Sequence, residues 1–210
     1  MDGTYVQKVA RLAGNLIVNP LYLPRYLRYL PVKGAQPLDV GLPWYSFSAI
    51  DLLARHVTSN SVVFEWGGGG STLFWARRAR QVICVESSDT WADRLETVLD
   101  NLGVSNVTVL RHYFDPQSKE SFKESEYLNC IDDYSADVVV IDGYEESVQL
   151  RPLCFYKAES KARSGLTIVL DDSWRYSTVR NKNCANRQVI CKSVGPCRYG
   201  VTTTDLFFIE

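Results

Sequence analysis

Four consecutive glycines, at positions 67–70, constrain this 210-residue chain more than any other feature. The apolar run at 62–66 precedes them and is typical of a buried strand, and residues 70–79 have the pattern of a helix. Glycine suits such a turn because it adopts backbone angles that a Cβ forbids and lets the main chain approach a ligand closely. The segment therefore predicts the first strand, turn and helix of a nucleotide-type βαβ unit.

The spacing around the turn is Glu65-x-Gly67-x-Gly69-x-Ser71. It differs from the dinucleotide fingerprint G-x-G-x-x-G, and no Lys-Ser or Lys-Thr pair follows as in a phosphate-binding loop. A carboxylate two residues before the first glycine favours a ligand that carries a positive charge over a pyrophosphate. A glycine-rich loop without a ligand is the alternative.

Carboxylates stand where several other predicted strands end. The second strand, 81–86, ends in Glu86, and a carboxylate in that place can accept hydrogen bonds from both hydroxyls of a ribose. The third strand, 106–110, is followed by His112 and Asp115, either of which could contact a base. We expect these side chains at the carboxyl edge of the sheet, where open α/β sheets bind ligands.

Two further buried strands deliver an acidic trio to the same edge. Residues 136–143 contain Asp142, and residues 165–170 are followed by Asp171 and Asp172. Two last strands, 188–194 and 202–209, predict an antiparallel hairpin. The fold class expected is therefore α/β, with a doubly wound, mostly parallel, seven-stranded sheet that ends in a C-terminal antiparallel hairpin.

The first 45 residues are predicted to be an N-terminal cover or arm, followed by one ligand-binding domain over 46–210. A helix is expected over residues 5–17, and prolines are expected to break regular structure in residues 20–31. Arginine and tyrosine alternate with leucine there, so this stretch could contact a partner or a membrane surface; packing over the sheet or the ligand is the alternative. Residues 116–135 are predicted to be a surface loop or short helix, and a candidate lid.

Composition sets limits on partners and location. The length fits one domain, and the formal net charge of −1 provides no global field that would attract nucleic acid. No apolar run is long enough for a transmembrane helix, and we expect no signal peptide. The six cysteines form no Cys-x-x-Cys pair and are expected to be reduced thiols of a cytoplasmic protein.

With these residues in view, the chain from about 42 to 210 resembles class I S-adenosylmethionine-dependent methyltransferases. The stretch from Glu65 to Ser71 looks like the family motif E/D-x-G-x-G-x-G with serine at the third glycine position, and residues 137–143 look like its fourth-strand motif. The segment 41–53, the pair Arg151 and Cys154, and the C-terminal residues 194–208 also resemble the corresponding parts of a microbial branch of the family. The resemblance implies a Rossmann-like methyltransferase fold that holds S-adenosylmethionine through one set of residues. These are Glu65, Gly67, Gly69, Ser71, Glu86 and Asp115.

The acidic trio is similar in placement to the Mg²⁺ ligands of catechol-type and macrolide-sugar O-methyltransferases. Asp142, Asp171 and Asp172 are thus candidate ligands for Mg²⁺, which prefers oxygen donors. The function expected is O-methylation of a hydroxylated small molecule, a sugar or a secondary metabolite, with assistance from Mg²⁺. The alternative is that these carboxylates only cap helices and that no metal binds.

The general base is less well defined by the sequence. Asp142, Asp171 and Glu145 are the predicted catalytic residues, and Glu146 or His112 are alternatives for the base. Relatives place Asp two residues, or Lys three residues, after the fourth-strand Asp. Tyr144 and Glu145 stand at these positions here.

Three other functions compete with this prediction. One is a metal-independent methyltransferase that acts on nitrogen or on a macromolecule, although no Asn/Asp-Pro-Pro-Tyr motif follows the fourth strand. A non-catalytic Rossmann-like binding module is another. The third is an NAD-dependent oxidoreductase, which the glycine spacing and Glu65 disfavour.

Overall fold

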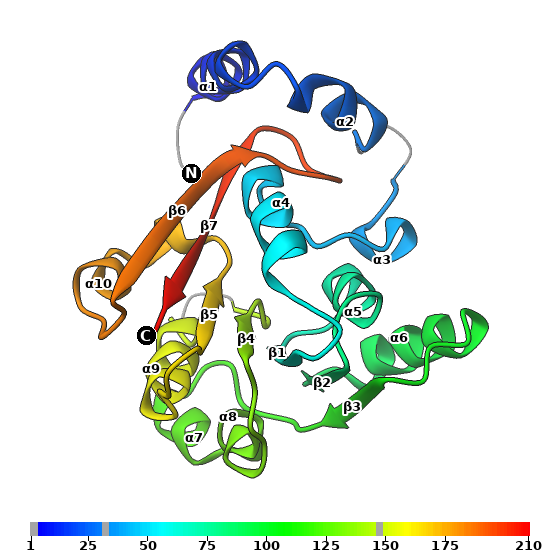
Figure 1. Cartoon of the computed structure of the whole chain (residues 1–210), viewed down its shortest axis with the longest axis vertical. Helices are drawn as coiled ribbons and strands as arrows, with labels where there is room; N and C mark the ends of the chain where they lie inside the picture. The colour runs from blue at the N-terminus through cyan, green and yellow to red at the C-terminus, as the bar shows by residue number, and fades with distance from the viewer. Residues whose placement is uncertain (1–3, 31–33, 146–148) are drawn as a thin grey trace.

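The chain folds around one seven-stranded sheet (Figure 1). A computed structural model describes residues 4–30, 34–145 and 149–210. The strand order is β3-β2-β1-β4-β5-β7-β6; the five strands from β3 to β5 run parallel, whereas β7 is antiparallel to both β5 and β6. The predicted fold class is confirmed. The strands are β1 (Val62–Trp66), β2 (Gln81–Glu86), β3 (Val107–Arg111), β4 (Val138–Ile141), β5 (Thr167–Leu170), β6 (Arg187–Val194) and β7 (Val201–Phe208).

Helices cover both faces of the sheet (Figure 1). Alternate residues of a strand point to opposite faces, so Phe64 and Trp66 pack on one side with Phe155 of α9, while Val63 packs on the other side with Leu53 of α4. The helices are α1 (Tyr5–Val18), α2 (Tyr22–Arg28), α3 (Pro37–Val40), α4 (Phe47–His56), α5 (Gly70–Ala76), α6 (Asp89–Asn101), α7 (Lys119–Glu124), α8 (Glu126–Asn129), α9 (Arg151–Ser160) and α10 (Ser177–Asn181), with short 3-10 turns η1 (Cys130–Asp133) and η2 (Ser173–Arg175).

The sheet edge at β6 is covered by α1 rather than left open. The side-chain amide of Asn15 accepts from Val194 N at 3.1 Å and donates to Lys192 O at 3.5 Å. An edge strand carries unpaired backbone groups that can pair with another chain, and a covering helix reduces that risk. The helix predicted over residues 5–17 is therefore confirmed, and its role in the fold is to protect this edge.

Residues 20–31, where prolines are expected to break regular structure, contain the helix α2. Pro24 is the third residue of α2, where its missing N–H has no role because the first turn of a helix lacks intrahelical acceptors. Residues 1–3 and 31–33 of the predicted arm lie outside the described residues. The polar stretch 175–187 contains α10, which brings Arg180 to the fully buried Asp205 of β7 at 2.6 Å. That ion pair joins residues far apart in sequence, so no local pattern could indicate it.

Residues 116–135 contain the short helices α7 and α8 and the turn η1. This agrees with the prediction of a loop or a short helix. Phe122 and Tyr127 from these helices are buried in the core on the α9 side of the sheet. In the part of the chain that the structure describes, no helix has the length and apolar character needed to span a bilayer.

The glycine turn lies where the strand order reverses, between β1 and β4. Gly67 has φ of +87°, and a Cβ there would lie 2.5 Å from the Cα of Gly143, in the loop after β4. A Cβ at Gly68 would lie 2.3 Å from the Sγ of Cys84 on β2. Both positions therefore need glycine for contact with neighbouring strands, and Gly67 needs it for its backbone angle as well.

We expect Gly67→Ala to lower the free energy of unfolding by about 3 kcal/mol or more, because it adds a clash with backbone to an unfavourable φ. Gly103→Ala is the matched control, since Gly103 also has positive φ (+64°) but no atom within 4 Å of the added Cβ. That control is expected to cost about 1 kcal/mol. Urea unfolding of both variants measures the difference, and equal losses would contradict a tight contact between Gly67 and Gly143.

Candidate active site

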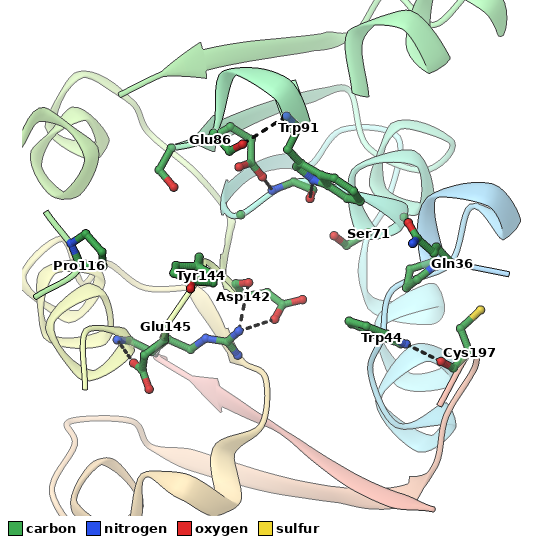
Figure 2. A pocket seen from close by; sticks show the side chains of 18 of the residues that line it. Gln36, Trp44, Ser71, Glu86, Trp91, Pro116, Asp142, Tyr144, Glu145 and Cys197 are labelled. Atoms are coloured by element: carbon green, nitrogen blue, oxygen red, sulfur yellow. Dashed lines mark hydrogen bonds and ion pairs between the residues drawn. The ribbon is translucent and has the colours of Figure 1, made fainter. Parts of the chain in front are cut away.

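A cavity of about 1030 Å³ opens at the carboxyl ends of β1, β2 and β4 (Figure 2). Its walls come from the segment before α4, the glycine turn, the residues after β2 and β3, and the loop after β4. This is the topological switch point of the sheet, where α/β folds bind their ligands. Of the ten predicted site residues, the cavity brings together Gly67, Gly69, Ser71, Glu86, Asp142 and Glu145, and it leaves out Glu65, Asp115, Asp171 and Asp172.

Glu65 lies beneath the glycine turn and not in the cavity wall. Its carboxylate accepts from Thr72 Oγ1 at 2.7 Å and from Trp75 Nε1 at 3.2 Å, and the side chain is fully buried. Burial raises its pKa to about 7, although hydrogen bonds from Ser71, Thr72 and Trp75 oppose that rise. Glu65 therefore positions the start of α5 from below, and a direct ligand contact has no geometric support.

Glu86 lines the cavity, as its place at the end of β2 predicts. The backbone N–H of Gly68 donates to its carboxylate, which orients Glu86 toward the turn (Figure 2). Burial raises its pKa to about 7, while backbone hydrogen bonds from Gly68 and Ser87 lower it. The result is an oriented carboxylate, 8% exposed, at one end of the cavity.

Trp91 lines the cavity but is not among the predicted site residues. It lies in the first turn of α6, its Nε1 donates to the carbonyl of Gly68 at 2.8 Å, and its ring faces the cavity (Figure 2). A Cβ at Gly69 would meet only this ring, at 3.7 Å, so the main chain of Gly69 is accessible from the cavity. Trp91 follows soon after Glu86, the acidic residue that ends β2, and this position in the sequence could have identified it as a wall residue.

The residues after β3 contribute rings rather than charges. Phe114 and Pro116 line the cavity, and Tyr113 stands at its rim with 80% of its surface exposed. The carboxylate of Asp115 points elsewhere and accepts from Gln117 N at 2.9 Å. His112 pairs with Glu126 at 3.2 Å outside the cavity. The predicted contact of Asp115 with a ligand base is therefore not supported by its position.

Asp142 lies at the other end of the cavity and forms an ion pair with Arg151 at 2.9 Å (Figure 2). Burial raises the pKa of Asp142 to about 7, with Arg151 lowering it and Asp172 and Glu65 raising it further. Burial lowers the pKa of Arg151, but the charge of Asp142 outweighs that effect and keeps the guanidinium protonated. The family resemblance drew attention to Arg151 without assigning it a role.

Arg151 also joins the loops around the cavity. Its guanidinium donates to the carbonyls of Gly143, Asp171 and Asp142 at 2.9, 3.1 and 3.1 Å. All of these acceptors and the Asp142 carboxylate lie at the carboxyl ends of β4 and β5, so one side chain fixes both strand ends. A guanidinium with these partners is not available to bind an anionic ligand.

The trio Asp142, Asp171 and Asp172 does not form the predicted magnesium site. Asp171, also a predicted catalytic residue, is buried, accepts from Thr204 Oγ1 at 2.6 Å and does not line the cavity. Asp172, with φ of +48°, pairs with Arg198 at 3.4 Å and accepts from Thr202 at 3.1 Å. Among the described residues, no three His, Cys, Asp or Glu side chains are placed to hold a metal ion.

Each carboxylate of the trio already has a partner within the protein. Arg151 pairs with Asp142, Thr204 donates to Asp171, and Arg198 pairs with Asp172. Burial raises the pKa of Asp171 well above its usual value, with Asp142 and Asp172 adding to that effect, so it is a poor anionic ligand. In this arrangement the three side chains do not fit Mg²⁺.

Glu145 lines the cavity, but its carboxylate is engaged by other groups. It accepts from the backbone N–H of Leu150 at 2.7 Å and of Arg151 at 2.8 Å, and from the Tyr176 hydroxyl at 2.6 Å, while only 1% of its side chain is exposed. Glu145 therefore caps the start of α9 and is poorly placed to act as a base. The alternative base Glu146 lies outside the described residues.

No protein-family model and no curated protein matches this chain. Several solved structures do match this chain. Cofactor-bound Rv0187 from MTB aligns with a TM-score of 0.59 and 20% identity over 95% of this chain and 89% of that one. An rRNA methylase from Streptococcus thermophilus aligns with a TM-score of 0.54 and 12% identity over 84% of this chain and 98% of its own.

A third structure, SMU.1697c from Streptococcus mutans in complex with SAH, aligns with a TM-score of 0.52 and 12% identity over 82% of this chain and 98% of that one. Identities this low carry information about architecture and not about substrate. The chain therefore has the Rossmann-like fold of class I methyltransferases, as its sequence predicts.

Proposed function

We propose that this protein is an S-adenosylmethionine-dependent methyltransferase that methylates a hydroxyl group on an uncharged small molecule. The observation that carries the proposal is the single cavity that joins the glycine turn and Glu86 at one end to Asp142 at the other. The SAH complex and the cofactor-bound structure among the similar folds support the choice of cofactor. Fold alone does not choose a function, so the proposal rests on these side chains.

The cavity has groups suited to each part of the cofactor. The Glu86 carboxylate can accept from both ribose hydroxyls, and Trp91 and Phe114 offer apolar surface for the adenine. The accessible main chain at Gly69 and the hydroxyl of Ser71 can contact the amino-acid end. When bound, S-adenosylmethionine would supply a methyl group on a positively charged sulfur, which Glu86 and Asp142 complement electrostatically.

The remaining wall favours a neutral acceptor. Trp44 and Tyr144 flank the Asp142 end of the cavity (Figure 2), and Tyr113 stands at its rim. Arg151 is the one basic residue among the described wall residues, and its guanidinium is engaged by carbonyls and Asp142. A nucleic-acid acceptor needs cations that can reach phosphates. One of the similar folds is an rRNA methylase, but this cavity has no such cations among its described residues.

Asp142 is the residue we assign as general base. Arg151 holds its Oδ1 at 2.9 Å, and we assign Oδ2 to accept the proton of the acceptor hydroxyl. A base is most effective when its pKa lies near the working pH, and burial places that of Asp142 at about 7. Arg151 thus acts as a positioning residue that fixes the carboxylate and limits the rise in its pKa.

Binding of the cofactor is the first test. Calorimetry should give a one-to-one complex with S-adenosylmethionine, and Glu86→Gln should weaken it at least about ten-fold because an amide cannot accept from both ribose hydroxyls. Asp115→Asn is the matched control, since that side chain lies outside the cavity, and its affinity should change less than about two-fold. No binding by the unmodified protein, or equal losses in both variants, would contradict the assigned cofactor site.

The role of Asp142 predicts a pH profile. Transfer of labelled methyl to a panel of phenols and sugars should rise with pH through about 7, because the base acts only when ionised. Asp142→Asn should lower kcat about 100-fold or more and leave cofactor affinity within a few-fold. Cofactor binding without turnover on any acceptor would instead favour a non-catalytic binding module.

Metal removal separates this mechanism from the magnesium-assisted one that the sequence suggested. Because Asp171 and Asp172 are engaged by Thr204, Thr202 and Arg198, we expect activity in excess EDTA to stay within about two-fold of the untreated value. The comparison is a sample treated with EDTA and then given excess Mg²⁺. Loss of activity that Mg²⁺ restores would contradict the assignment of Asp142 as a metal-independent base.

A further inference from the structure

The outer face of α1 is apolar and exposed. We use this name for Val6, Ala10, Ala13, Gly14, Ile17 and Val18, which share one side of the helix at spacings of three, four and seven residues. Val6, Ile17 and Val18 are each about three-quarters exposed, at 74%, 78% and 77%. No residue of α1 is buried. A patch of this kind on a soluble protein is typical of an interaction site.

The opposite face of the same helix already serves the fold. Leu12 and Leu16 pack against the core on the α4 side of the sheet, and Asn15 holds the edge of β6. Packing of α1 on the domain therefore does not explain the apolar residues on its outer face. A helix that is apolar on both sides is expected to contact a second apolar medium.

Exposed leucines also occur on and just before α2, which follows α1 along the rim of the molecule (Figure 1). Leu21, Leu23 and Leu27 are exposed, while Tyr26 of the same helix is buried against the domain. Two successive helices thus use one face to pack and leave leucine or valine on another. Pro24, which the sequence suggested would break this segment, is accommodated in the first turn of α2.

The charge of this region has one sign. Residues 4–30 contain Lys8, Arg11, Arg25 and Arg28 and no aspartate or glutamate, although the whole chain has a net charge of −1. Arg25 pairs with Asp51 of α4 at 2.6 Å, whereas Lys8 and Arg28 are exposed. Exposed apolar side chains together with an excess of cations are the features of helices that lie in the surface of an anionic membrane.

We propose that α1 and α2 dock this protein on an anionic lipid surface, with the outer face of α1 inserted among the head groups and acyl chains. A second copy of the chain is less suitable, because its α1 and α2 would bring the same cations and no acidic residue to the contact. The inference does not depend on the methyltransferase activity, since neither helix lines the cavity.

Vesicle flotation of the whole protein tests this. We expect binding to vesicles of phosphatidylcholine with phosphatidylserine, at least about ten-fold weaker binding to phosphatidylcholine alone, and weaker binding as salt rises from about 0.05 M to about 0.5 M. The double variant Val6→Glu with Ile17→Glu should lower partitioning at least about ten-fold, because it places charge on the inserting face.

Leu102→Glu is the matched control, because Leu102 is an exposed leucine (56%) after α6, distant in sequence from the arm, and its variant should bind vesicles like the parent. Since Val6 and Ile17 are exposed, the double variant should unfold at the parent's temperature and bind S-adenosylmethionine equally. Equal binding to neutral and anionic vesicles, or no binding, overturns the proposal. A dimer in light scattering that the double variant abolishes, without vesicle binding, would assign this face to a second copy and overturn it as well.

Discussion

The site depends on one buried cation. Arg151 pairs with Asp142 and binds three backbone carbonyls at the ends of β4 and β5. Without a carboxylate partner this guanidinium would be too costly to bury, and without the guanidinium Asp142 would be neutral in its buried position. Each group therefore lowers the cost of burying the other. Glu145 completes the arrangement, because it caps the start of α9 and so fixes the backbone from which Arg151 extends.

Burial raises the pKa of three acidic side chains around the glycine turn to about 7. The three side chains nevertheless have different roles. Glu65 is enclosed by α5 and positions the turn, Glu86 is oriented by the backbone of Gly68, and Asp142 is held by Arg151. The first is a structural group, and the other two face the cavity from opposite ends. In the proposed reaction this separation distinguishes binding of the ribose from removal of a proton.

The two functions proposed for the chain occupy separate parts of it. The segment at 34–37 and Trp44 form part of the cavity wall, whereas α1 and α2 cover the β6 edge and the rim. Neither α1 nor α2 lines the cavity, so docking would not engage the residues of the proposed active site. An acceptor that partitions into or near lipid would be consistent with the apolar rings of Trp44 and Tyr144. Vesicle flotation and the methyl-transfer assay test the two functions independently.

The sequence by itself determined the α/β fold class, the glycine turn and the presence of carboxylates at the strand ends. These features follow from local periodicity and from the backbone angles that only glycine adopts easily. Gly67, Gly69, Ser71, Glu86 and Asp142, all predicted site residues, line one cavity. Only the tertiary structure decided what each carboxylate contacts. Asp171 and Asp172 meet Thr204, Thr202 and Arg198, and α10 forms around the pairing of Arg180 with Asp205. These partners come from strands and loops distant in sequence, so local patterns could predict an acidic edge but not that arginines, rather than a metal ion, would balance it.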